Sequence, residues 1–283
     1  MATRINTIRT ENSGGGQIFD GASGTFGVSL ADGDAVILRE SRDRYTSALT
    51  IPTIDLASLT FEPGFLGEIS GDTPLAVEVN NTGTGLVTIE PGGRALKLSA
   101  GDPAKVWAEV RSRTAAALTF SNGTIGDGTD GGWFASGGGS IIFAEDVSWA
   151  ANSVLENAGC QIHLRESAGK SVPTLRHVAG TTKLEIDVAT LNIRGGPDSI
   201  VTIDSSNCTP TAVNIDGGVL ELLECGTISA LNGSGGVVDF SRVKGMPTLT
   251  ATALGPGVIV RLRRGQTYTA TADYAGGPRI VYV

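Results

Sequence analysis

The chain has 283 residues, of which 40% are hydrophobic, 5% aromatic and 18% charged, so we expect one domain with a thin, largely aliphatic core. Its forty glycines follow no period of three and alternate with apolar residues, which excludes collagen and argues against global disorder. The formal net charge of -8 argues against nucleic acid as a partner, because phosphate-binding surfaces need clustered Lys and Arg.

Residues 1–45 are polar and rich in glycine, and the run at 11–17 (ENSGGGQ) is typical of a flexible arm. We interpret this segment as an N-terminal arm that attaches the protein to a partner. Its isolated apolar residues cannot form a core alone, so we predict that they dock on that partner: Ile5, Ile8, Ile18, Phe19 and Phe26. The segment has no apolar run of signal-peptide length and no later window resembles a membrane span, so we expect folding in the cytoplasm of a host cell and no membrane partner.

Residues 46–260 repeat one short phrase, in which apolar and polar residues alternate over three to five positions and glycine follows. Instances are LTFEPG (59–64), VTIEPGG (87–93), LKLSAG (96–101), LTFSNG (118–123), IHLRESAG (162–169), LNIRGG (191–196) and VNIDGG (213–218). A β-meander or sandwich would also place turns at such spacing. However, most junctions lack the symmetric second strand of a hairpin, which favours strands that stack on their equivalents one coil later.

The predicted fold is therefore all-β, a single-stranded parallel β-helix (β-solenoid). Leu184, Val201, Leu220 and Val238 recur every 17 to 19 residues, which predicts coils of about 17–22 residues. Inward positions should carry aliphatic ladders, and outward positions Thr, Glu, Asp, Arg and Ser.

Two stretches interrupt this rhythm. Residues 102–113 and 149–159 contain helix-forming residues, and we expect each to be a short helix or a projecting loop. Between them, residues 122–139 have too many glycines for regular structure, so Trp133 and Phe134 are predicted to contact a neighbouring molecule.

Residues 261–283 alternate strongly and end in an apolar strand. We interpret them as a C-terminal β cap, or as strands that pair with another subunit. The basic group Arg261, Arg263 and Arg264 is interpreted as a solvated strand face rather than as a site for an anionic partner.

Acidic residues were considered as catalytic candidates, because β-helices often carry glycosidases and lyases, and glycoside hydrolysis uses two carboxylates. The candidates are Asp187, Asp204, Asp216, Glu221 and Glu224. Acids at strand ends are common for turn formation and solubility, and residues 184–241 hold one Phe and no Trp or Tyr as a sugar-stacking surface. The sequence therefore predicts no catalytic residues.

Cofactor and metal sites are not predicted either. His163 and His177 have no further ligand at metal-binding spacing, the acidic glycine-rich run at 126–132 is not a repeated calcium nonapeptide, and the Gly pairs lack the context of a phosphate loop. Cys160, Cys208 and Cys225 are expected to be buried thiols.

Residues 227–271, with LNGSGG followed by VVDFS, resemble the glycine-punctuated β-helix rungs of bacteriophage virion proteins. These include capsid decoration (cement) proteins and tail fibre or spike subunits. The resemblance implies a non-enzymatic virion protein that forms a homotrimer and binds the major capsid protein or another virion component.

A capsid-stabilising decoration protein is the leading expectation. The alternatives are a spike or fibre subunit that binds a cell-surface glycan and, from the enzyme class, a polysaccharide lyase or glycosidase. Aromatic and acidic side chains that converge in one groove would favour the alternatives, whereas a smooth outer face with an N-terminal arm would favour decoration.

Overall fold

The computed structural model describes residues 106–283 except 127, 130, 167 and 168. Before residue 106 it describes the ranges 3–8, 35–41, 49–51, 58–61, 68–69, 73–79, 86–90 and 96–99. The described part is all-β, with stacked parallel coils that form a β-solenoid of about 9 turns. The predicted fold class is thus confirmed.

Contacts between residues divide the chain into two compact units, Met1–Ser153 and Val154–Val283, which are described separately. This division differs from the predicted segments 1–45, 46–260 and 261–283.

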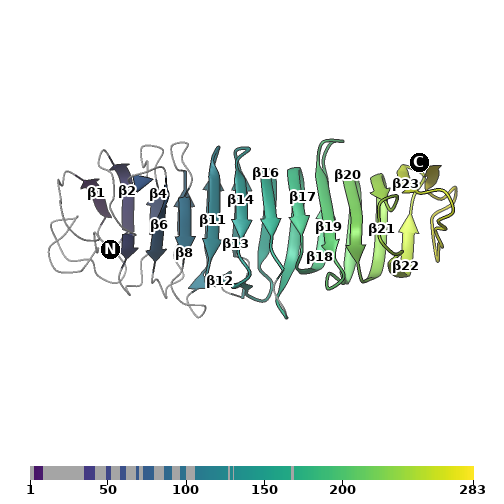
Figure 1. Cartoon of the computed structure of the whole chain (residues 1–283), viewed down its shortest axis with the longest axis horizontal. Helices are drawn as coiled ribbons and strands as arrows, with labels where there is room; N and C mark the ends of the chain where they lie inside the picture. Colours follow the sequence, from purple (N-terminus) through teal and green to yellow (C-terminus); the bar gives the residue numbers. More distant parts are fainter. Residues whose placement is uncertain are drawn as a thin grey trace. The chain divides into compact units, whose positions relative to one another are not determined.

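The described residues of unit 1 form fifteen strands, each two to seven residues long. They are β1 (Thr3–Ile8), β2 (Ala35–Ser41), β3 (Leu49–Ile51), β4 (Ser58–Phe61), β5 (Glu68–Ile69), β6 (Thr73–Val79), β7 (Leu86–Ile89), β8 (Leu96–Ser99), β9 (Val106–Trp107), β10 (Glu109–Arg113), β11 (Ala117–Ser121), β12 (Gly123–Ile125), β13 (Gly132–Ser136), β14 (Ser140–Phe143) and β15 (Val147–Trp149) (Figure 1).

The strands of unit 1 form three parallel stacks, one for each side of the coil. The first runs β1, β2, β4, β7, β10, β13, and the second runs β3, β6, β8, β11, β14. The short strands β9, β12 and β15 form the third. Among the strands that the structure describes in this unit, only β5 departs from this order, in an antiparallel pair with β6. Each coil therefore hydrogen-bonds to the next coil rather than within itself.

The N-terminal segment takes part in the first stack. The backbone of β1 pairs in parallel with β2, and β2 pairs with β4. Residues 3–8 and 35–41 are thus part of the solenoid, which corrects the expectation of a separate arm for these two stretches. The rest of that segment lies outside the described residues.

The core of unit 1 is largely aliphatic, as expected, but it also holds a cluster of four buried aromatic side chains. Trp107, Phe120, Trp133 and Phe143 are each at most 1% exposed. Phe120 packs against Trp107 at a ring-centroid distance of 4.8 Å, and Trp133 meets Phe143 edge-on at 4.9 Å. Burial of these large side chains adds apolar area to the aliphatic core of unit 1.

The stretches predicted as helices or loops are strands. In β10, Val110 and Ser112 point inward while Glu109 and Arg111 alternate outward, so helix-forming residues here obey a period of two. Residues 149–159 contribute the end of β15 and the start of β16. The expectation of no regular structure in the glycine-rich run 122–139 was also wrong, because this run contains the whole of β12 and β13, and Gly123 and Gly132 begin these strands.

Unit 2 is built from fewer and longer strands, which lie side by side in Figure 1. They are β16 (Val154–Leu164), β17 (Ser171–Leu184), β18 (Asp187–Ile193), β19 (Ile200–Ser205), β20 (Ala212–Cys225), β21 (Thr227–Asp239), β22 (Thr248–Leu254), β23 (Val258–Leu262) and β24 (Arg279–Tyr282).

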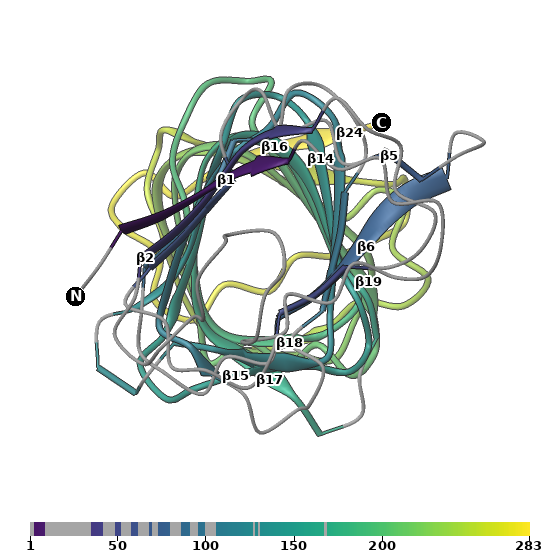
Figure 2. The same ribbon diagram turned by 90° about the vertical axis from the view of Figure 1, so that its left-hand side faces the viewer.

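The long strands of unit 2 turn a corner of the coil at a break in register. In β20, residues before the break pair with β18 and residues after it pair with β19, and β21 follows both halves of β20. Figure 2, seen along the stacking direction, shows the coils overlying one another. Corresponding side chains of successive coils therefore form columns.

Aliphatic columns fill the interior of unit 2. One column is Leu155, Leu175, Leu191, Val213 and Leu231, and another is Val201, Leu220, Val238 and Val260. All of these side chains are fully buried. They are the inward ladders that the repeated phrase predicts.

Glycine follows these strands because successive coils touch at the corner. A Cβ on Gly217 would lie 2.4 Å from the carbonyl oxygen of Gly195, and one on Gly257 would lie 2.2 Å from that of Ser234. At these two positions any larger residue would push the coils apart, so glycine is a packing requirement there.

Residues 263–278 contain no strand, and β24 then pairs in parallel with β23. The last residues carry exposed apolar side chains on Ile280, Tyr282 and Val283. No helix within the described residues is long and apolar enough to cross a membrane.

Candidate binding groove

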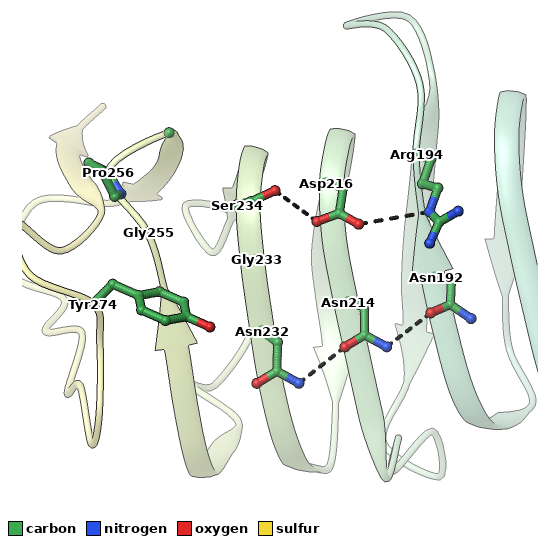
Figure 3. A pocket seen from close by; sticks show the side chains of 11 residues that line it. Asn192, Arg194, Asn214, Asp216, Asn232, Gly233, Ser234, Gly255, Pro256 and Tyr274 are labelled. Atoms are coloured by element: carbon green, nitrogen blue, oxygen red, sulfur yellow. Dashed lines mark hydrogen bonds and ion pairs between the residues drawn. The ribbon is translucent and has the colours of Figure 1, made fainter.

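An open groove of about 510 Å³ crosses the outer face of unit 2 over successive coils (Figure 3). Its volume lies within the usual range for ligand sites, about 300–1,000 Å³. The lining residues come from β18, β20, β21 and the turns that follow β22 and precede β24: Asn192, Arg194, Asn214, Asp216, Asn232, Gly233, Ser234, Gly255, Pro256, Gly257 and Tyr274.

A ladder of three asparagines runs along the groove. Each occupies the outward position after a buried residue, and register places Asn192, Asn214 and Asn232 on adjacent strands. Asn214 Nδ2 donates to Asn192 Oδ1 at 2.9 Å, and Asn232 Nδ2 donates to Asn214 Oδ1 at 3.1 Å. Each amide group retains a second N–H and further lone pairs for a ligand.

A second polar row lies beside the ladder. Ser234 donates its hydroxyl to Asp216 Oδ1 at 2.8 Å, and Asp216 Oδ2 lies 3.8 Å from Arg194 Nε. The Arg194 side chain is 72% exposed, so this ion pair is solvated and weak. The row fixes the position of Asp216 and keeps the guanidinium at the edge of the groove.

Tyr274 forms the wall at the other end. Its backbone N–H donates to the carbonyl of Leu254 at 3.2 Å, and its carbonyl accepts from Gly277 at 2.7 Å, so the residue is held at both sides. The side chain remains 60% exposed and lies near Asn232 in Figure 3. An exposed aromatic ring thus adjoins a row of amides.

This combination suits a polyhydroxylated ligand. Amide groups offer donors and acceptors in fixed positions, and an aromatic ring offers a face for an apolar surface of the ligand. Asp216 is the only carboxylate among the groove-lining residues, and Ser234 and Arg194 already contact it. Hydrolysis by paired carboxylates would need a second acid within about 5–10 Å.

The other acids considered as catalytic candidates lie apart from this groove and contact neighbouring coils. Asp204 lies 3.0 Å from Lys183 Nζ, Glu221 accepts from Thr202 at 3.3 Å, and Glu224 pairs with Lys244. Asp187 accepts the backbone N–H of Thr209 at 2.7 Å. Four of the five thus join coils to one another, as acids at strand ends commonly do.

A second hollow, of about 380 Å³, also holds carboxylates. It is lined by Glu166, Gly169, Lys170, Ser171, Glu185, Ile186, Asp187 and Asn207. Glu166 accepts from Asn207 at 2.7 Å and Glu185 pairs with Lys183, so its acids already have partners. Within the described ranges, no group of three or more His, Cys, Asp or Glu side chains is placed to hold a metal ion.

The residues predicted to bind a partner do not form one surface. Trp133 is fully buried, and its indole N–H donates to Ser112 Oγ at 2.8 Å, so the prediction of an exposed contact was wrong for this residue. Phe134 is the next residue of β13 and is partly exposed. Ile5 and Ile8 belong to β1, whose backbone alone is described. Ile18, Phe19 and Phe26 lie outside the described residues.

The histidines and cysteines serve the fold. His177 is buried, and its Nδ1 lies 3.0 Å from Thr182 Oγ1, to which Asn157 also donates at 2.9 Å. Burial lowers the pKa of His177 to about 4. Burial also raises the pKa of Cys225 to about 12 and that of Cys208 further, so both thiols stay protonated and unreactive.

Apart from Asp216, which was a candidate acid, the groove residues were not predicted from the sequence, although it carries a signal for them. The pairs Leu191-Asn192, Val213-Asn214 and Leu231-Asn232 repeat at the same place in the phrase. The outward positions of the phrase were expected to carry Thr, Glu, Asp, Arg and Ser, and asparagine was not among them. Tyr274 lies outside the segment searched for aromatic residues.

Comparison of the chain with protein families, with curated proteins and with solved structures finds no match.

Proposed function

We propose that the protein is a non-enzymatic β-solenoid that binds a cell-surface glycan through the groove of unit 2. The observation that carries this proposal is the asparagine ladder, Asn192, Asn214 and Asn232, with Tyr274 beside it. A sugar presents hydroxyl groups at its edge and C–H groups on its face, which match amides and an aromatic ring respectively.

The ladder suits an extended glycan because its repeat is fixed by the fold. Neighbouring strands lie about 4.8 Å apart, so Asn192 and Asn232 are separated by about 10 Å along the stacking direction. A ligand that contacts both must lie across the strands. The groove therefore favours an oligosaccharide over a single sugar.

A place in a phage particle is supported by the resemblance of residues 227–271 to virion β-helix rungs. The convergence of an aromatic side chain and an acid, Tyr274 and Asp216, in one groove favours a tail spike or fibre subunit over a capsid decoration protein. The inclusion of β1 and β2 in the stack also weakens the case for a decorating arm. As part of this proposal, the subunit forms a homotrimer in the virion.

A matched pair of tyrosines tests the glycan proposal. Tyr274 is 60% exposed in the groove, and Tyr282 is 58% exposed outside it. Full-length protein is applied to an array of bacterial surface oligosaccharides, together with Tyr274→Ala and Tyr282→Ala. We expect wild type and Tyr282→Ala to bind the same glycans, and Tyr274→Ala to lose at least about tenfold in affinity.

Absence of binding to every glycan, or equal affinity of Tyr274→Ala and wild type, would refute the proposal. The position in the particle has its own test, in which antibody-labelled particles are imaged by electron microscopy. Label on the tail agrees with a spike or fibre, whereas label over the shell means decoration.

A further inference from the structure

The two ends of the groove differ chemically. Arg194 lies at one end and Tyr274 at the other, with the asparagine ladder between them (Figure 3). The Tyr274 end offers an uncharged aromatic face beside Asn232. The Arg194 end offers a guanidinium group, whose charge Asp216 offsets in part from 3.8 Å, so the two ends must contact different parts of a bound glycan.

The guanidinium of Arg194 contacts Asp216 through Nε, and its terminal nitrogen atoms remain available to a ligand. Asp216 lies 3.8 Å from its Nε atom, and Ser234 holds Asp216 in place from the other side. Among the described residues, no hydrogen bond or ion pair involves the terminal Nη1 and Nη2 atoms of Arg194. This edge of a guanidinium is the one that binds a carboxylate through two parallel hydrogen bonds.

The ladder adds donors at the same end. Its hydrogen bonds all run toward Asn192, so the Nδ2 group of Asn192 donates to no other member of the ladder, whereas Asn232 Oδ1 accepts from none. Arg176 pairs in register with Asn192 on the adjacent strand β17 and is exposed. Glu156 pairs in register with Arg176 on its other side, so Arg176 has an acidic neighbour, and Arg194 and Asn192 are the donors that face the groove.

We infer that the glycan is acidic, and that it binds with a sugar carboxylate on the Nη edge of Arg194 and an uncharged ring on Tyr274. This inference rests on the proposed glycan-binding function and adds the ligand class and its direction in the groove. The donors of Asn192 and Arg194 match a carboxylate, which only accepts hydrogen bonds when ionised.

The test compares ligands that differ in one group. Oligosaccharides that contain glucuronate or galacturonate are paired with their carboxyl-reduced forms, in which the same sugars carry an uncharged CH₂OH. Affinities are measured by calorimetry for the full chain, Arg194→Gln, Arg194→Lys and a control, Arg264→Gln. Arg264 is exposed and lies outside the groove, so its substitution changes the net charge equally.

We expect wild type and Arg264→Gln to prefer the acidic form by about tenfold or more, as for hydrogen bonds to charged groups. Arg194→Gln should bind both forms equally, at the affinity of wild type for the reduced form. Arg194→Lys should keep part of the preference, because it retains the charge but not the planar fork.

Equal binding of acidic and reduced forms by wild type would overturn the inference while leaving glycan binding intact. An acidic preference that persists in Arg194→Gln would overturn it too. Failure of every form to bind would instead refute the proposed function. Thermal melting of each variant confirms that any loss of affinity occurs in folded protein.

Discussion

Among single residues, Gly217 gives a direct test of the packing between coils. Gly217→Ala places a Cβ 2.4 Å from the carbonyl oxygen of Gly195, and a backbone atom cannot give way cheaply. We expect a loss of about 2–3 kcal/mol in the free energy of unfolding, as for overpacking. Gly196→Ala is the control, because nothing lies within 4 Å of its Cβ. Denaturant unfolding that shows equal stability for both variants would contradict the corner packing.

The buried side chain of His177 should make the stability of the protein depend on pH. Burial lowers its pKa from 6.5 to about 4, so below about pH 6.5 the unfolded chain binds a proton that the folded chain excludes. Stability should therefore fall as the pH drops from 6.5 to 4, and this group should cause no further loss below pH 4. Between pH 7 and pH 4.5, His177 should lower the free energy of unfolding by roughly 2–3 kcal/mol.

The measurement is the free energy of unfolding at pH 7 and at pH 4.5, in wild type and in His177→Gln. The variant lacks the titrating imidazole. Its free energy of unfolding should therefore decrease less between pH 7 and pH 4.5 than that of wild type, by roughly 2–3 kcal/mol. An identical decrease in both proteins would show that His177 does not remain neutral in the folded state.

At the scale of elements, the asparagine ladder should stabilise the stack of β18, β20 and β21. Asn214→Ala removes two hydrogen bonds between strands, whereas Asn192→Ala removes one. With about 0.5–1.5 kcal/mol for each bond, we expect Asn214→Ala to cost about twice as much as Asn192→Ala. Equal losses in chemical denaturation would mean that the ladder contributes no interstrand stability and that the amides act only toward a ligand.

The elements also show what could be predicted from the sequence. Alternation and glycine spacing predicted the parallel coils, and Val201, Leu220 and Val238 do share one column. Leu184 pairs instead with Ile203, because Thr182 takes the inward position and bonds to His177. The helix predictions failed because propensity was weighed above a period of two, which β10 follows.

The site was less predictable than the fold for a physical reason. Asn192, Asn214 and Asn232 are distant in sequence, and only the register of three strands makes them neighbours. Tyr274 comes from a stretch without regular structure, held in place by backbone hydrogen bonds to Leu254 and Gly277. Alternation along one strand says which residues face outward, but not which of them meet across coils.

At the scale of the whole molecule, the fold provides a regular outer face on which coil spacing sets the spacing of polar groups. Hydrogen bonds between coils fix the strands, inward aliphatic columns fill unit 2, and aliphatic side chains together with an aromatic cluster fill unit 1. The outward side chains take no part in core packing, so their identity can vary without disturbing the interior. In unit 2, one outward column consists of the asparagines that form the amide ladder of the groove.

If the ladder contacts the glycan, binding must change the chemical environment of its side-chain amides. The NMR signals of these amides therefore test the proposed binding surface directly. In a nitrogen-15 NMR titration of the full chain with an oligosaccharide bound on the array, we expect the Nδ2 signals of Asn192, Asn214 and Asn232 to shift in a saturable way. The signal of Asn152, whose amide bonds to the Gly128 carbonyl in unit 1, should stay fixed. Saturable shifts confined to residues outside the groove, with the three ladder signals unmoved, would contradict the account.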